Sequence, residues 1–165
     1  MMDVPPTIHG RNNLESWAKL REFVAAFPDD DYWARWKPMV IGVLDTLESY
    51  GLRDVFRAGQ SMHDIVFSTA DHHGLRDEPR VVLTFYPFQQ LVRTTYLRLP
   101  QKPAWAIESG KVAQSPHVFM APLTLERLIS PAKGTRAILE YLRMLWVDTK
   151  SHTTPLPAAF HSLDV

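Results

Sequence analysis

The period of the hydrophobic pattern changes twice along the chain, and this change constrains the fold more than any other feature. Between residues 12 and 50, apolar residues recur every three or four positions, as on one face of a helix. Between residues 62 and 120 they alternate or gather in β-branched and aromatic runs, as in strands. From residue 130 to 149 the helical period returns. Consecutive strands without intervening helices predict an antiparallel sheet with helices on one face, an α+β fold.

Two helices are predicted before the strands, separated by Pro28. Asn12 and Glu15 have the spacing of a capping box, so the first helix is expected to begin there. Pro38 is expected at the first position of the second helix, where its missing N–H has no partner to lose. Gly51 follows as a left-handed stop.

The strand region predicts a meander of three to six strands. The stronger candidates are residues 62–69, 80–86 and 91–99, and the weaker ones are 104–108, 111–113 and 117–120. Residues 87–90 are expected to join two of them as an antiparallel hairpin. Ser130 and Pro131 then mark the start of one long C-terminal helix. We therefore expect a single α+β domain over residues 1–150 and a C-terminal tail over 151–165.

Charge and cysteine content restrict the function classes. The chain has 18 basic and 18 acidic residues, so it lacks the basic footprint of a general nucleic-acid binder. It has no cysteine, which excludes disulfides and thiolate metal sites and favours a reducing compartment such as the cytoplasm. The longest apolar run has six residues, far below the ~20 that span a bilayer, and no secretory signal is visible. No membrane association is expected, and zero net charge makes self-association easier.

His63, Asp64, Asp71, His72 and His73 form the densest polar cluster. Imidazole and carboxylate groups are suitable ligands for zinc, iron or manganese. Their spacing matches no H-E-x-x-H pattern, and no predicted helix aligns them. The cluster is therefore interpreted as a hydrated loop, and the sequence predicts neither a metal site nor a cofactor.

Ser61, His63 and Asp64 contain the three residue types of a nucleophilic triad. On a continuous strand, Ser61 and His63 would share one face and Asp64 would point away, which prevents a relay. The sequence also lacks the second glycine of a nucleophile elbow, because His63 stands at that position. We assign no catalytic residue and retain Ser61, His63, Asp64 and His73 as weak candidates.

The predicted hairpin combines basic and aromatic side chains, namely Arg80, Tyr86, Arg93, Tyr96 and Arg98. Arginine and tyrosine are enriched at the energetic centres of protein interfaces, so this sheet face is the best candidate binding site. The alternative is a solvated face with ordinary cross-strand pairs. Trp33 and Trp36, beside the acidic run 29–31, are further binding candidates, with packing as the alternative.

Three function classes remain. The first is a non-enzymatic cytoplasmic protein-binding domain, such as an adaptor, a chaperone or an inhibitor of the immunity type, that uses an exposed sheet face and has another protein as its partner. The second is a small hydrolase-type or metal-dependent enzyme centred on His63, Asp64 and His73. The third is a structural subunit of a larger assembly, including a homo-oligomer.

Overall fold

The computed structural model describes residues 7–8, 10–70, 75, 78–98, 123–150 and 154–164. Within these residues one sheet contains six strands in the order β1-β2-β3-β4-β5-β6, and every neighbouring pair is antiparallel. The strands are β1 (Thr7–Ile8), β2 (Arg57–Ser61), β3 (Asp64–Ser68), β4 (Arg80–Tyr86), β5 (Leu91–Arg98) and β6 (Leu123–Ile129). The predicted α+β meander is confirmed.

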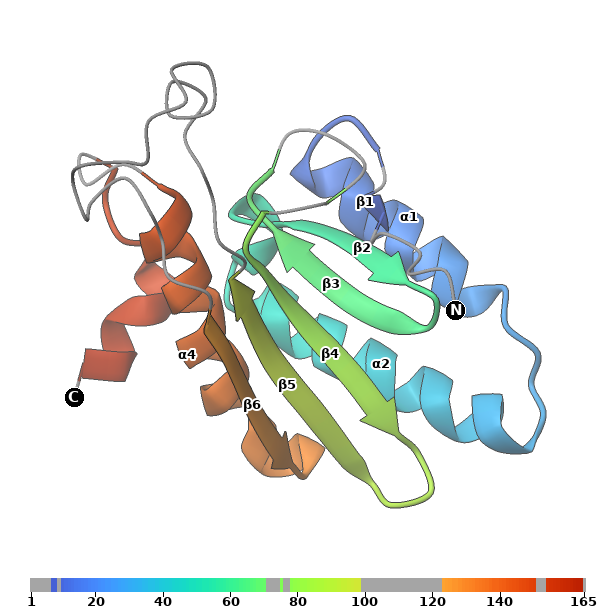
Figure 1. Ribbon diagram of the computed structural model, residues 1–165. Helices are drawn as coiled ribbons and strands as arrows, with labels where there is room; N and C mark the ends of the chain where they lie inside the picture. The colour runs from blue at the N-terminus through green and yellow to red at the C-terminus, as the bar shows by residue number, and fades with distance from the viewer. Residues whose placement is uncertain are drawn as a thin grey trace, which may run out of the picture.

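The helices lie before and after the run of strands β2 to β6 in sequence and behind the sheet in space (Figure 1). They are α1 (Asn13–Ala25), α2 (Asp31–Ser49), the 3-10 turn η1 (Leu52–Asp54), α4 (Pro131–Thr149) and the 3-10 segment η3 (Ala158–Asp164). Helix α1 packs on β2, α2 on β4, and α4 on β4 and β5. The helices therefore cover one face of the sheet, as the sequence predicted.

The main core lies between this helical layer and the sheet. Its largest fully buried side chains include Trp17, Trp36, Phe67 and Tyr96. A smaller cluster of Ile8, Val66 and Leu75 lies apart from it. Because Val66 pairs with Val82 and with Gly59, this cluster belongs to the other face of the sheet, near β1 to β3.

The start of α1 agrees with one half of the predicted capping box. The Glu15 backbone N–H donates to Asn12 Oδ1 at 2.9 Å. The Glu15 carboxylate instead accepts from the Arg11 backbone N–H at 3.1 Å. Gly51 has φ of 77° directly after α2, which is the left-handed stop that the sequence predicted.

The predicted start of the second helix at Pro38 is wrong, because α2 begins at Asp31 and contains Pro38 in its interior. Proline there removes one helical hydrogen bond. Packing of the first two turns outweighs this loss: Trp36 is fully buried, and the Phe27 and Trp33 ring centroids lie 4.2 Å apart. Negative charge at the helix start adds to this stabilisation.

The strand predicted over residues 62–69 is also wrong in its first part. The chain reverses at Met62 and His63, and β2 precedes this turn where no strand was predicted. Met62 has φ of 57°, a left-handed conformation that a tight turn requires. A Cβ atom on Gly59 would lie 2.1 Å from the Thr7 carbonyl oxygen, so this glycine permits β1 to approach β2.

The C-terminal half contains one strand that was not predicted. Strand β6 pairs along its whole length with β5. The weaker candidates at 104–108, 111–113 and 117–120, and the end of the candidate at 91–99, lie outside the described residues. The predicted C-terminal helix is present as α4, and the segment predicted as a tail contributes the fully buried Phe160 to the main core.

Candidate functional site

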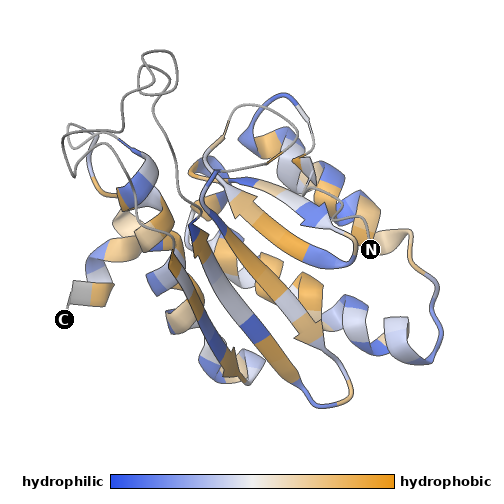
Figure 2. Ribbon diagram, viewed as in Figure 1, coloured by the Kyte–Doolittle hydropathy of each residue, from blue (hydrophilic) through white to orange (hydrophobic). Residues whose placement is uncertain are grey.

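Alternation along β4 and β5 sends neighbouring side chains to opposite faces of the sheet. Val81, Leu83 and Phe85 point toward the helices, and so do their partners Tyr96, Thr94 and Val92 on β5. The residues between them point to the face without helices, which we call the open face. Figure 2, viewed as Figure 1 with the helices behind the sheet, shows hydrophobic and hydrophilic bands along β5 and β6.

The open face is hollowed where β4, β5 and β6 lie together. The hollow has a volume of about 490 Å³ and is lined by Tyr86, Gln89, Leu91, Arg93, Glu126, Arg127 and Leu128. Leu128 is 57% exposed beside Arg93, its partner across the strands. The hollow therefore combines an arginine, an aromatic ring and apolar side chains, the composition of an interface centre.

Arg93 lies at the middle of a row of open-face residues. Its guanidinium carbon is 5.8 Å from the centroid of the Tyr86 ring, within cation–π distance. Thr84 is its partner on β4, and Asp64 begins β3 on the same row. Arg93 Nε is buried without a hydrogen-bond partner. The Tyr86 ring and the neighbouring strands thus hold the Arg93 guanidinium beside the hollow.

Asp64 is the half-buried carboxyl group of the open face. Burial raises its pKa above the ordinary value of 3.8. The Thr84 hydroxyl and the positive charges of His63 and Arg93 act in the opposite direction and do not cancel the effect of burial. Asp64 therefore holds a proton more readily than an exposed aspartate does.

His63 lies in the turn before Asp64 and contacts an aromatic cluster at the start of α2. Its ring centroid is 6.0 Å from that of Trp33, with the planes nearly perpendicular. Tyr32 packs against Trp33 at 4.7 Å and against Phe88 of the β4–β5 turn at 6.0 Å. Burial is the main cause that raises the Tyr32 pKa, and the Asp64 charge adds to it. The cluster connects α2 with both turns at this end of the sheet.

The predicted binding residues do not all share one face. Tyr86 and Arg93 lie on the open face and line the hollow. Tyr96 and Arg98 point to the helical side, because they stand at odd intervals from Arg93 along β5. Tyr96 is fully buried, and its hydroxyl donates to the Asp148 carboxylate of α4. The assignment of Tyr96 to an exposed binding surface is therefore wrong.

Burial also removes two further candidates from that surface. The alternation of β4 places Arg80 on the open face, but its side chain is buried and the residue is only 5% exposed. Trp36 is fully buried in the main core, so packing is the correct interpretation of this residue. Trp33 is half-buried inside the aromatic cluster and lies outside the hollow.

The weak catalytic candidates are separated by the β2–β3 turn. Ser61 ends β2 opposite Asp64, whereas His63 belongs to the turn, so the expected shared face of Ser61 and His63 is wrong. None of the three lines the hollow. His73, with Asp71 and His72, lies outside the described residues. Among the residues that are described, no three His, Asp or Glu side chains are placed to hold a metal ion.

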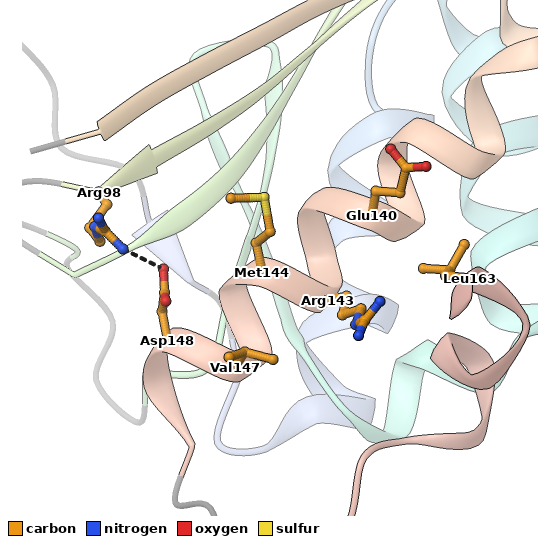
Figure 3. Close-up of a pocket in the computed structure, with 7 residues that line it drawn as sticks. All are labelled: Arg98, Glu140, Arg143, Met144, Val147, Asp148 and Leu163. Atoms are coloured by element: carbon orange, nitrogen blue, oxygen red, sulfur yellow. Dashed lines mark hydrogen bonds and ion pairs between the residues drawn. The ribbon is translucent and has the colours of Figure 1, made fainter. Parts of the chain in front are cut away.

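A second hollow, of about 410 Å³, lies on the helical side between α4 and η3 (Figure 3). Its apolar side chains are Met144, Val147 and Leu163. At one end Arg98 Nη1 donates to Asp148 Oδ2 at 3.1 Å. Burial, followed by the hydrogen bond to Asp148, raises the Tyr96 pKa above its ordinary value. The Asp148 carboxylate accepts from both Tyr96 and Arg98, so it joins α4 to β5.

Comparison with known proteins gives no relative: no family model, curated protein or solved structure matches the chain. None of the described helices has the length and apolar character needed to cross a membrane.

Sequence reasoning missed five residues that line the hollow: Gln89, Leu91, Glu126, Arg127 and Leu128. Leu91 could have been found, because it lies two positions before Arg93 in a predicted strand and therefore points to the same face. Glu126, Arg127 and Leu128 were missed because no strand was predicted over residues 123–129. Their alternation of Leu, Thr, Leu and Glu was a signal that the nearby Pro122 obscured.

Proposed function

We propose that this protein is a small binding domain that holds another protein against the open face of β4, β5 and β6. One observation carries the proposal: the hollow combines the Tyr86 ring, the Arg93 cation and the exposed Leu128 on the face that the helices leave uncovered. Large aromatic and arginine side chains in a partly desolvated hollow give most of the binding free energy at interfaces.

The rest of the molecule supports a rigid platform for this face. The helices bury the opposite side of the same strands, and Ile8, Val66 and Leu75 fill the other half of the open face. Among the described residues, the hollow is therefore an accessible part of the open face. An adaptor, a chaperone or an inhibitor of the immunity type, working in a reducing compartment such as the cytoplasm, fits these properties and the cysteine-free sequence.

The test is affinity capture from the native cell with matched surface variants. The wild-type protein is expected to retain a stoichiometric partner, and Leu128→Asp and Arg93→Glu are expected to release it. Leu14→Asp is the control, because Leu14 is 52% exposed on α1, away from the sheet's open face. An affinity loss of about tenfold or more, or about 1.4 kcal/mol, is expected for the two open-face variants.

Two results would contradict the proposal. One is the absence of any stoichiometric partner in captures from cells that produce the protein. The other is a partner that both open-face variants retain as well as the wild type and Leu14→Asp do. Circular dichroism of each variant establishes that the fold is intact before capture is compared.

A further inference from the structure

We infer that the bound partner adds an extended strand to the outer edge of β6, antiparallel to it. The inference rests on the proposed function and specifies how the same site holds its partner. Main-chain hydrogen bonds to β6 supply affinity in this mode of recognition, and side chains that enter the hollow supply specificity.

Strand β6 is the last strand of the sheet, and no described strand pairs with its outer edge. Its seven residues exceed the usual strand length of about five or six. In an antiparallel ladder every second residue directs its N–H and C=O groups away from the neighbouring strand. An edge of this length is a template for another strand, and its two charged residues, Glu126 and Arg127, limit which strand fits.

The hollow reaches this edge. Glu126, Arg127 and Leu128 are consecutive residues, and all three line the hollow. Consecutive residues of a strand point to opposite faces, so a hollow that touches all three extends around the backbone of β6. An added strand would therefore lie beside Glu126 and Leu128, at the border of the hollow, with β6 between it and the Leu91 and Arg93 side chains of β5.

The side chains of β6 define the chemistry of the added strand. On the open face an apolar residue is favoured opposite Leu128, whose exposed side chain it would contact at the border of the hollow. Two residues later in the antiparallel partner, a lysine or arginine is favoured opposite Glu126. Arg127 points to the helical side, where its Nη1 already lies 3.0 Å from Glu140 Oε2. The expected motif is apolar, any residue, then basic.

A second copy of this chain fits the edge less well. When two β6 strands pair antiparallel over all seven residues with their open faces on one side, position 126 is opposite itself. Two glutamates then face each other, and like charges directly opposite are destabilising. Charge complementarity therefore favours a partner segment with a basic residue over self-pairing.

The test uses a synthetic peptide with the sequence valine, isoleucine, glutamate, lysine, valine, threonine between polar flanks, and the full-length protein. Its isoleucine and lysine are placed opposite Leu128 and Glu126. Two-dimensional amide NMR is expected to show saturable shifts in β5 and β6. Hydrogen exchange is expected to slow at every second β6 amide, the ones that point outward. Exchange of the amides that already bond to β5 serves as the internal reference.

Charge exchange across the new strand pair provides the specificity control. Glu126→Lys is expected to weaken binding of the lysine peptide about fivefold, and a peptide with glutamate in place of that lysine is expected to restore it. Leu14→Asp is expected to bind both peptides as the wild type does.

Different failures have different meanings. A peptide or captured partner that shifts the open-face resonances but leaves β6 exchange unchanged would overturn strand addition and leave the proposed binding function standing. Absence of peptide binding would also overturn strand addition, because capture by the open face is measured separately. A dimer that sedimentation detects in both the wild type and Glu126→Lys, and that protects the β6 amides from exchange, would also overturn the inference. It would show that a second copy of this chain occupies the edge of β6.

Discussion

The two faces of β4 and β5 contain the same residue types but have different roles. On the helical face Tyr96 is fully buried and binds Asp148 of α4. On the open face Tyr86 is half-buried and lies beneath the Arg93 guanidinium. The face to which alternation directs each side chain therefore distinguishes a tyrosine that packs in the core from a tyrosine that lines the hollow.

The carboxyl groups of the two faces differ in the same way. Asp148 accepts hydrogen bonds from Tyr96 Oη and from Arg98 Nη1, which keeps its charge satisfied beside the core. Asp64 is half-buried, and burial raises its pKa in spite of the nearby positive charges. Two donors thus compensate the Asp148 charge on the helical side, whereas the Asp64 carboxyl of the open face is less well compensated and holds a proton more readily.

The largest expected difference between the faces is in stability. Leu83→Ala is expected to lower the free energy of unfolding by about 2–5 kcal/mol, because Leu83 is fully buried against the helices. Leu128→Ala, on the open face of the same sheet, is expected to change it by less than about 0.5 kcal/mol. Urea unfolding followed by tryptophan fluorescence measures both. Equal losses for the two leucines would show that the open face is part of the core.

The next comparison is between the two tyrosines. Tyr96→Phe is expected to lower the free energy of unfolding by about 1–2 kcal/mol, since it removes a hydroxyl that donates to a carboxylate. Tyr86→Phe keeps the ring beneath Arg93 and is expected to change stability by less than about 0.5 kcal/mol. A loss for Tyr86→Phe as large as that for Tyr96→Phe would contradict the assignment of Tyr86 to the hollow.

The sequence predicted the layers of the fold because hydrophobic period is a local property. The alternation of Val81, Leu83 and Phe85 defines β4 without knowledge of its neighbours. The helical spacing around Leu142 and Trp146 likewise defines α4. Where a local rule and packing disagreed, packing decided: Pro38 stands inside α2 because the aromatic residues before it extend the helix.

The candidate site was predicted only in part, because it depends on which face of the sheet each side chain occupies and on one strand that was not predicted. Tyr86 and Arg93 were found by residue type. Tyr96 was included wrongly because residue type does not say which face a side chain occupies, and five positions of β5 separate it from Leu91. The contribution of Glu126 and Leu128 arises from pairing between β5 and β6, a contact that no local pattern contains.

A smaller effect is expected from the charge of Asp64. Its folded pKa lies above the unfolded value of 3.8, so its contribution to stability is fully present below 3.8 and is lost as pH rises through the folded pKa. Asp64→Asn removes the ionisation. The free energy of unfolding of this variant, relative to that of the wild type, is therefore expected to increase as the pH rises from below 3.8 to neutrality.

Chemical unfolding at several pH values measures this difference. Ser61→Ala is the control, because it changes the residue opposite Asp64 and removes no ionisable group. If wild type instead gained stability relative to Asp64→Asn as pH rose, attraction from Arg93 and His63 would outweigh burial, and the open face would be as well compensated as the helical side.

The smallest expected effect concerns the ion pair at the border of the two faces. Arg127 and Glu140 lie 3.0 Å apart, but their side chains are 51% and 38% exposed. Exposed pairs of this kind contribute little and are screened by salt. A double-mutant cycle with Arg127→Ala and Glu140→Ala is expected to give a coupling free energy below about 0.5 kcal/mol that vanishes at high salt. A coupling free energy above about 1 kcal/mol that persists at high salt would mean that this pair behaves as a buried one and belongs to the helical side.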